Sequence, residues 1–344
     1  MRLFAFLDEE GPAVGLLTAR GRVIPLRGIG GGLDLALAED RLAELLSEAR
    51  AAAGPGKGSS AAKGGAAGKG SSAGKGGAAG KVAKGPAGGV ARADLEPLPA
   101  VEFPGKIICV GLNYAAHAAE GGRGAPDHPV LFAKFANAVI GDGEPIVRPE
   151  GTHALDLEAE LGVVIGRRAH RVTPEAAAAC IAGYVVVNDV SARDWQGVPA
   201  ALREGERGDG QWLRAKGSDT FLPVGPVFVT PDEIDPAAGL RIRSWRIPGR
   251  GPDAGTSILM QDGTTADLLW SVPELIAHIS RTVTLLPGDL IATGTPSGVG
   301  VFRDPPIFLE PGDRVRIEVE GIGTVENPII DWSEVPADED GESD

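Results

Sequence analysis

The chain has 344 residues, enough for one large domain and a smaller one, and its formal net charge is −14. Such an acidic chain is a poor candidate for binding nucleic acid, whose phosphates attract basic surfaces. The sequence contains no apolar run of about 18 residues and begins with only a short apolar stretch. We therefore expect a cytoplasmic protein without a membrane partner.

The first 50 residues predict a small N-terminal α/β domain. Three short apolar runs are typical of strands, and a longer segment with helical spacing predicts one amphipathic helix. The strands are expected at residues 3–6, 13–17 and 22–26, and the helix at residues 35–49.

Residues 51–92 differ in composition from the rest of the chain. A segment rich in Gly, Ala, Lys and Ser, from Gly56 to Ala67, is followed by a near-copy from Gly68 to Ala79. Without aromatic or acidic residues it cannot offset the entropy lost on ordering, so we predict a low-complexity linker. Half of the last residues, 333–344, are acidic, and they predict a disordered tail.

The region 104–331 predicts a mostly β domain, because its apolar runs are short and rich in β-branched residues. The candidate strands are residues 107–112, 138–141, 159–166, 184–190, 225–229, 240–245, 289–293 and 314–319.

Three carboxylates in this region predict a metal site. Glu158 and Glu160 lie beside the apolar run 162–165, and side chains two residues apart on a strand share one face. Asp189 ends a second β-branched run and adds a third carboxylate. Without a nearby Cys or paired His, the set favours Mg²⁺, Mn²⁺ or Ca²⁺. An isolated Glu-x-Glu pair is more often an exposed strand edge, so this prediction depends on the wider pattern.

A second candidate pair is His117 with Glu120. They lie three residues apart in an alanine-rich segment that predicts a short helix with Asn113 as its N-cap. The two side chains would share a helix face, and a carboxylate beside an imidazole suits a general base acting on water. Taken alone, the spacing is more often that of a surface pair.

A series of motifs across residues 104–330 resembles the fumarylacetoacetate hydrolase family, in its acylpyruvase and 2-hydroxyhepta-2,4-diene-1,7-dioate isomerase-like branch. Each motif is weak alone, but their number and order are specific. They are Lys106–Glu120, Phe132–Phe135, Leu155–Leu161, Gly183–Gln196, Lys216, Pro223–Pro226, Pro287–Asp289, Thr293–Gly300, Pro311–Asp313 and Gly321–Gly323. The resemblance implies an α+β, mostly β fold with a mixed β-roll catalytic domain, a small N-terminal domain and a homodimer.

The resemblance also implies a role for each candidate site residue. Lys216 would join the His117–Glu120 dyad in catalysis, and the three carboxylates would bind the metal. The substrate would be held by Arg193, Gln196, Thr295, with Thr293 as a competing candidate, and Gln261. The Asn-Gly turn that precedes this last position in the family is missing here.

Three functions remain open from the sequence. The first is a metal-dependent hydrolase that cleaves a C–C bond in an acylpyruvate or a related 1,3-diketo acid, using water activated by the His117–Glu120 dyad. The alternative is an isomerase or decarboxylase acting on intermediates of the 2-hydroxymuconate or 2-hydroxyhepta-2,4-diene-1,7-dioate type. A non-catalytic binding protein is the third. The dyad favours hydrolysis, because isomerisation needs no activated water.

Overall fold

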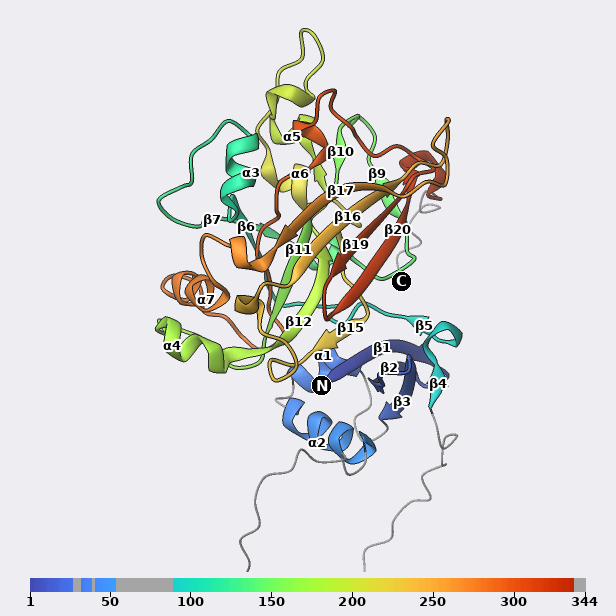
Figure 1. Ribbon diagram of the computed structural model, residues 1–344, viewed down its shortest axis with the longest axis vertical. Helices are drawn as coiled ribbons and strands as arrows, with labels where there is room; N and C mark the ends of the chain where they lie inside the picture. The colour runs from blue at the N-terminus through green and yellow to red at the C-terminus, as the bar shows by residue number, and fades with distance from the viewer. Residues whose placement is uncertain (27–31, 39–40, 54–88, 337–344) are drawn as a thin grey trace, which may run out of the picture.

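The computed structural model describes residues 1–26, 32–38, 41–53 and 89–336, and these residues form mainly β-structure (Figure 1). In this part of the chain the largest sheet has eleven strands, with β5 paired to β1 beside the main path. In spatial order the strands are β4 (Val90–Ala91), β3 (Arg22–Leu26), β2 (Gly11–Leu17), β1 (Arg2–Asp8), β15 (Val227–Val229), β12 (Ile181–Asn188), β11 (Ala159–Ile165), β18 (Leu290–Ala292), β6 (Ile107–Gly111) and β7 (Val130–Lys134), with β5 (Glu96–Pro97).

Within the described residues, a second sheet of five strands packs against β11 and β12. Its order is β17 (Ile258–Thr264), β16 (Arg241–Ile247), β19 (Arg314–Val319), β20 (Gly323–Asp331) and β9 (Ile146–Arg148). Two small ribbons pair β10 (Leu155–Asp156) with β13 (Ser191–Ala192), and β8 (Val139–Ile140) with β14 (Leu222–Pro223).

Both sheets are mixed, because β18 runs parallel to β6 and β9 runs parallel to β20 while their other pairs are antiparallel. The helices are short and lie around the sheets. They are α1 (Gly32–Ala38), α2 (Leu42–Ala53), α3 (Ala115–Glu120), α4 (Pro174–Ala177), α5 (Arg193–Gln196), α6 (Trp212–Gly217) and α7 (Val272–Ser280). The predicted fold class, α+β and mostly β, is confirmed.

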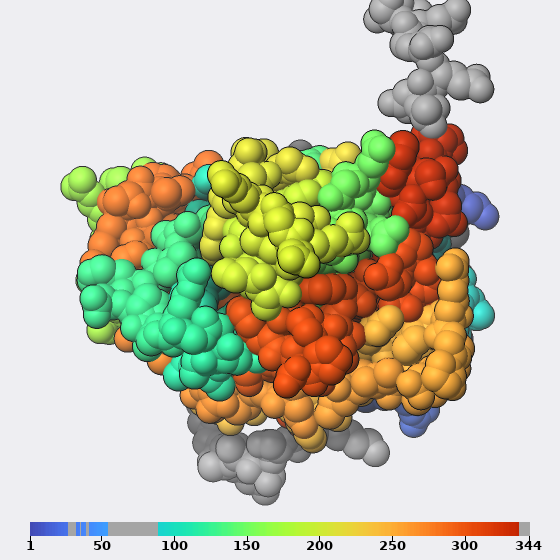
Figure 2. Space-filling model, turned by 90° about the horizontal axis from the view of Figure 1, so that it is seen from above, coloured from blue at the N-terminus to red at the C-terminus, as the bar shows by residue number. Residues whose placement is uncertain are grey.

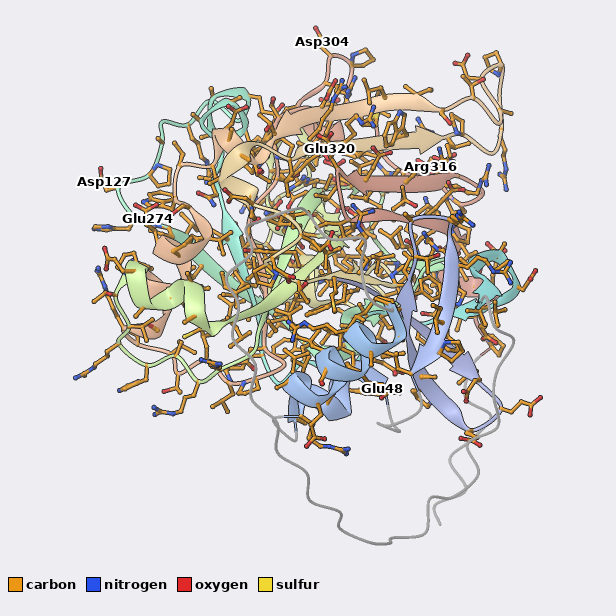
Figure 3. All side chains as sticks on the ribbon, turned by 60° about the horizontal axis from the view of Figure 1, so that its bottom comes forward. Glu48, Asp127, Glu274, Asp304, Arg316 and Glu320 are labelled. Carbon is orange, nitrogen blue, oxygen red and sulfur yellow. The ribbon has the colours of Figure 1, made fainter. Side chains whose placement is uncertain are left out.

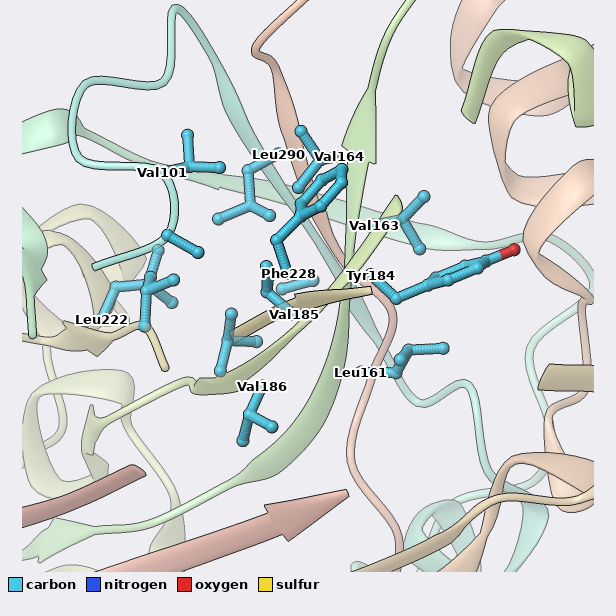
Figure 4. Packing of buried hydrophobic residues seen from close by; sticks show 14 of the residues in the cluster. Val101, Leu161, Val163, Val164, Tyr184, Val185, Val186, Leu222, Phe228 and Leu290 are labelled. Atoms are coloured by element: carbon cyan, nitrogen blue, oxygen red, sulfur yellow. The ribbon is translucent and has the colours of Figure 1, made fainter. Parts of the chain in front are cut away.

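The core lies where β11 and β12 are covered on both faces. Every residue of β11 is buried, which explains its continuous apolar run instead of an alternating one. Figure 4 shows Leu161 and Val163 of this strand beside Tyr184, and Val164 beside Phe228. Glu160 is the one charged residue in this buried strand, so it needs a specific partner.

The N-terminal strands fall at the predicted places, but the helix does not. Instead of one helix at 35–49 there are two, α1 and α2. The Arg41 amide donates to the Ala36 carbonyl, while the Arg41 carbonyl accepts from the Leu45 amide and starts α2. Apolar spacing alone does not reveal such a break, because both helices turn apolar residues toward the same strands.

The domain boundaries 1–50, 51–92, 104–331 and 333–344 remain predictions. Most of the linker and the tail falls on residues 54–88 and 337–344, which lie outside the described residues. At the linker ends, α2 continues to Ala53 and β4 pairs with β3. The sequence did not predict β7, β17, β20 or α7. In the described ranges, no helix has both the length and the apolar character required to cross a bilayer.

Candidate active site

The three predicted carboxylates come together where β11 and β12 pair. Glu160 faces into this region from β11, Glu158 directly precedes the strand, and Asp189 directly follows β12. Each offers an oxygen within 4.8 Å of the others. Their exposed fractions are 5%, 1% and 0% for Glu158, Glu160 and Asp189, so these are not the solvated carboxylates of a strand edge.

Buried cations compensate two of the three carboxylates. Lys216 Nζ lies 2.7 Å from Glu158 Oε2 and 3.0 Å from Asp189 Oδ2. Arg193 Nη1 lies 2.7 Å from Glu158 Oε1, and Lys134 Nζ lies 2.8 Å from Asp189 Oδ1. Burial by itself raises the pKa of Glu158, but the charges of Lys216 and Arg193 outweigh it and lower that pKa below its ordinary value.

Glu160 has no such compensation. It makes no ion pair in the described part of the chain, and it accepts one hydrogen bond, 2.8 Å long, from the Gly294 amide. Burial, followed by the negative charges of Asp189 and Glu158, raises the pKa of Glu160 well above its ordinary value. A hard divalent cation offsets this cost, and three oxygen donors at one point suit such an ion. The residues present therefore fit the predicted metal.

Arg193 is held rigidly but keeps a free donor. Its Nε donates to Asp156 Oδ2 at 2.9 Å, and its Nη1 donates to Gln196 Oε1 at 3.1 Å. Asp156 is itself fixed by the Gly300 and Val301 amides. Arg193 Nη2 is buried without a partner, although buried polar groups are normally hydrogen-bonded. Arg193 thus lines the cavity and keeps one guanidinium nitrogen that no group of the described residues uses.

His117 and Glu120 form a dyad on α3. His117 Nδ1 lies 2.7 Å from Glu120 Oε1, and Glu120 Oε2 accepts from the Gly298 amide at 2.8 Å. Because a carboxylate only accepts, Nδ1 carries a proton, and in the neutral imidazole Nε2 then holds the lone pair. The predicted N-cap was wrong, since the cap position is Tyr114. Asn113 instead bonds the backbone of Thr293 and Trp270, which ties α3 to neighbouring loops.

Thr295 and Gln261 form one hydrogen-bonded unit. The Thr295 hydroxyl donates to the Ala159 carbonyl at 2.9 Å and accepts from Gln261 Nε2 at 2.7 Å. Gln261 also donates to Pro296 O and accepts from the Ala159 amide and the Ser244 hydroxyl, so protein groups use its full capacity. Gln261 therefore lies behind Thr295, and Thr295 has an acceptor site but no spare proton for a ligand.

A cavity of about 150 Å³ connects these groups. Figure 2 shows three segments meeting on the face above it: one around 115–130, one around 195–215 and one around 300. The cavity walls include the predicted residues His117, Glu158, Glu160, Arg193, Gln196, Lys216 and Thr295, together with Leu112, Arg123, Phe132, Val198, Pro199, Trp212 and Phe302.

Two buried charges at the site were not predicted. Lys134 is 2% exposed at the end of β7, and Asp156 is 1% exposed in β10. A signal existed for Lys134, because it ends an apolar strand and so points a charge toward the core. Asp156 is part of the motif Leu155–Leu161, but nothing in a single sequence distinguishes its role from that of Glu158.

Comparison with known proteins agrees with this geometry. The family model described as "Fumarylacetoacetate (FAA) hydrolase C-terminal" matches residues 106–330. The chain is 42% identical over 239 residues to "Oxaloacetate tautomerase FAHD2B, mitochondrial" of Bos taurus, covering 70% of this chain and 71% of that protein. It is 42% identical over 229 residues to "Fumarylacetoacetate hydrolase domain-containing protein 2 homolog" of Dictyostelium discoideum, covering 66% and 72%.

Solved structures extend the similarity over nearly the whole chain. One is 2-hydroxyhepta-2,4-diene-1,7-dioate isomerase from Mycobacterium marinum, with a TM-score of 0.65, 31% identity, and coverage of 97% of this chain and 100% of that one. Another is 5-carboxymethyl-2-hydroxymuconate delta-isomerase from Mycobacterium smegmatis, with a TM-score of 0.65, 32% identity, and coverage of 96% and 100%. The protein is therefore an enzyme of the fumarylacetoacetate hydrolase family.

Proposed function

We propose that this enzyme interconverts the enol and keto forms of a small 2-oxo acid, using a divalent cation. The observation that carries the proposal is one cavity lined by three features: an uncompensated buried carboxylate, a free guanidinium nitrogen and a histidine base. Relatives named as a tautomerase and as isomerases favour an isomerisation over C–C hydrolysis, which was the first expectation; isomerisation of larger dienoate intermediates was the alternative from the sequence.

Glu158, Glu160 and Asp189 would hold the cation, with Mg²⁺, Mn²⁺ or Ca²⁺ as candidates. When bound, such an ion polarises a carbonyl oxygen and stabilises negative charge on an enolate. Lys216 remains a cation beside it: burial lowers the pKa of the ammonium, but Asp189 and Glu158 more than restore it. Two of its three N–H groups point to these carboxylates, which leaves one for a substrate oxygen.

Arg193 binds the carboxylate next to the keto group. Its Nη2 is the free donor, and the Asp156 and Gln196 contacts fix the guanidinium before the substrate arrives. A preorganised donor of this kind loses little entropy when the ligand binds. Gln196 therefore acts through Arg193 in this proposal, and Gln261 acts through Thr295.

His117 transfers the proton. Its Nε2 takes the enol hydroxyl proton and returns a proton to the adjacent carbon, while Glu120 stabilises the intervening imidazolium. The C=C bond of the enol becomes a single bond, and no carbon–carbon bond is cleaved in this reaction. The same base could also activate water, so the dyad by itself does not favour hydrolysis, and the preference rests on the comparisons.

The experiment adds the enol form of oxaloacetate to Mg²⁺- or Mn²⁺-loaded enzyme and follows the decay of enol absorbance. We expect faster decay than in enzyme-free buffer, loss of the effect with excess chelator, and no C–C cleavage product. Acylpyruvates are assayed in parallel for release of pyruvate. Cleavage of an acylpyruvate with the larger kcat/KM would reject the tautomerase proposal and restore the hydrolase.

Two predictions about the cellular context remain. A homodimer is expected from the family resemblance, and light scattering would then give twice the chain mass of 35.2 kDa. The cytoplasmic location also remains a prediction, and the bovine relative is named as mitochondrial. Microscopy of the tagged chain in its own cells would test the predicted location.

A further inference from the structure

We propose that Arg123 recognises a second carboxylate at the open side of the cavity, so that the substrate is a dicarboxylic 2-oxo acid. The inference rests on the proposed function for the reaction itself, but it concerns binding and can be tested without turnover. Arg123 was not among the residues selected from the sequence, and it is an exposed residue that lines the cavity.

The backbone places Arg123 firmly beside the catalytic dyad. Helix α3 ends in a Schellman motif, in which the Arg123 amide donates to Ala118 O at 2.9 Å and the Gly122 amide donates to Ala119 O at 3.0 Å. Gly122 has φ of +68°, a conformation that L-residues with side chains rarely adopt. The Arg123 side chain therefore starts from a defined point, three residues beyond Glu120 at the end of α3.

The guanidinium of Arg123 is available for a ligand. It forms no ion pair within the described ranges, and the nearby carboxylate of Glu120 is already bonded to His117 and the Gly298 amide. Asp127, the acid of the same loop, is exposed at the outer edge of the molecule (Figure 3), as is Asp304. An arginine that faces a cavity without a protein partner is a natural carboxylate receptor.

The cavity thus carries an arginine at each of two depths: Arg193, whose Nη2 alone lacks a partner, and Arg123, for which no ion pair is seen in the described residues. Arg193, 3% exposed, lies in its buried part, and Arg123 lies at its exposed part. The apolar side chains of Leu112, Trp212 and Phe302 line the same cavity and offer no hydrogen bond to a neutral polar end group except through the indole N–H. A 2-oxo acid with a carboxylate at each end satisfies both cations, whereas a monocarboxylate leaves Arg123 without a partner.

The decisive comparison uses two ligands with the same carbon skeleton. Oxaloacetate and its 4-methyl ester differ in the distal charge, and calorimetry on the Mg²⁺-loaded enzyme measures their Kd. We expect the wild type to bind oxaloacetate more tightly. Arg123→Ala and Arg123→Gln should each weaken the binding of oxaloacetate about 10-fold and leave the Kd of the ester unchanged. Arg123→Lys should retain part of the preference for oxaloacetate.

Arg168→Ala is the matched control, since it removes an exposed arginine beyond the far end of β11, away from the cavity lining. It should bind both ligands as the wild type does. Equal weakening of both ligands in the Arg123 variants, or no change in either, would overturn the inference. Arg123-dependent binding without enol decay would instead overturn the proposed function alone, and enol decay without any preference for the dicarboxylate would overturn this inference alone.

Discussion

Glu158 and Glu160 lie two residues apart in one buried cluster, yet their pKa values are shifted in opposite directions. Two cations, Lys216 and Arg193, each lie 2.7 Å from a Glu158 oxygen, whereas Glu160 receives only the Gly294 amide. The pKa of Glu158 is accordingly lowered and that of Glu160 is raised. One member of the pair is compensated by the chain itself, and the other needs a bound cation.

The first prediction concerns Glu160→Gln. The amide keeps the shape but removes the uncompensated charge, so the metal-free variant should unfold at a Tm no lower than that of the wild type. The stabilisation that metal gives the wild type, about 2.7 kcal/mol at a hundred times Kd, should disappear. Thermal unfolding with and without Mg²⁺ or Mn²⁺ measures both effects. A variant that retains the full metal-induced rise in Tm would exclude Glu160 as a ligand.

The second prediction is the pH dependence of metal-free stability. The folded pKa of Glu160 lies above the ordinary value of 4.5, so the folded state holds this proton to higher pH than the unfolded state does. Its contribution to the free energy of unfolding must therefore fall as pH rises above about 4.5. Glu158 has the opposite effect, because its folded pKa is lowered. Its contribution to the free energy of unfolding is present above about pH 4.5 and is lost as the pH falls below that value.

Urea unfolding in chelator across this pH range should therefore give a less negative slope above pH 4.5 for Glu160→Gln than for the wild type. Identical slopes for the two proteins would show that Glu160 ionises normally. Metal affinity should also rise with pH in this window, because proton and cation compete for the same oxygens.

The third prediction separates the base from the metal ligands. His117→Ala should slow enol–keto conversion by about 10²–10⁴-fold, the usual contribution of a positioned general base, while the metal Kd stays the same. Glu120→Gln should lose less, because the imidazole remains but its imidazolium is less well stabilised. Stopped-flow absorbance and metal titration measure the two quantities. Loss of metal binding in His117→Ala would mean a ligand or folding role instead.

The fourth prediction concerns the two lysines that pair with buried aspartates. Lys134 is 2% exposed and pairs with Asp189, whereas Lys106 keeps a third of its side chain in water and pairs with Asp289. Removing one partner of a fully buried pair costs about 3–5 kcal/mol. Lys134→Met should lower the free energy of unfolding by nearly this amount, and Lys106→Met should lower it by clearly less. Chemical denaturation measures both values. Equal losses would show that burial of the lysine is not what matters.

The sequence predicted that the three carboxylates come together, because the signal is local. Glu158 and Glu160 flank the start of an apolar run, and the period of a strand places them on one side. Asp189 followed from the end of a second such run. The order of motifs then identified the family, which the comparisons confirmed.

Other features depend on contacts that no local pattern encodes. The proton of Thr295 is directed to Ala159 by a long-range contact, and Gln261 is placed behind it by Ser244 of a neighbouring strand. The free guanidinium of Arg123 becomes visible only when the cavity is known. The choice between hydrolysis and isomerisation also could not come from the dyad, since a base in this position suits both reactions.

The pairing of β1 with β15 sets an order of events during synthesis. Met1 and Thr230, which are hydrogen-bonded to each other, lie 229 residues apart in the chain. The hairpins of β1, β2 and β3 need only local contacts and can form as soon as they leave the ribosome. On the other edge of β1, residues 6–7 pair with β5, but residues 2–4 wait for β15 until most of the chain has been translated. We therefore expect residues 2–4 to remain the open edge of the N-terminal strands until β15 pairs with them.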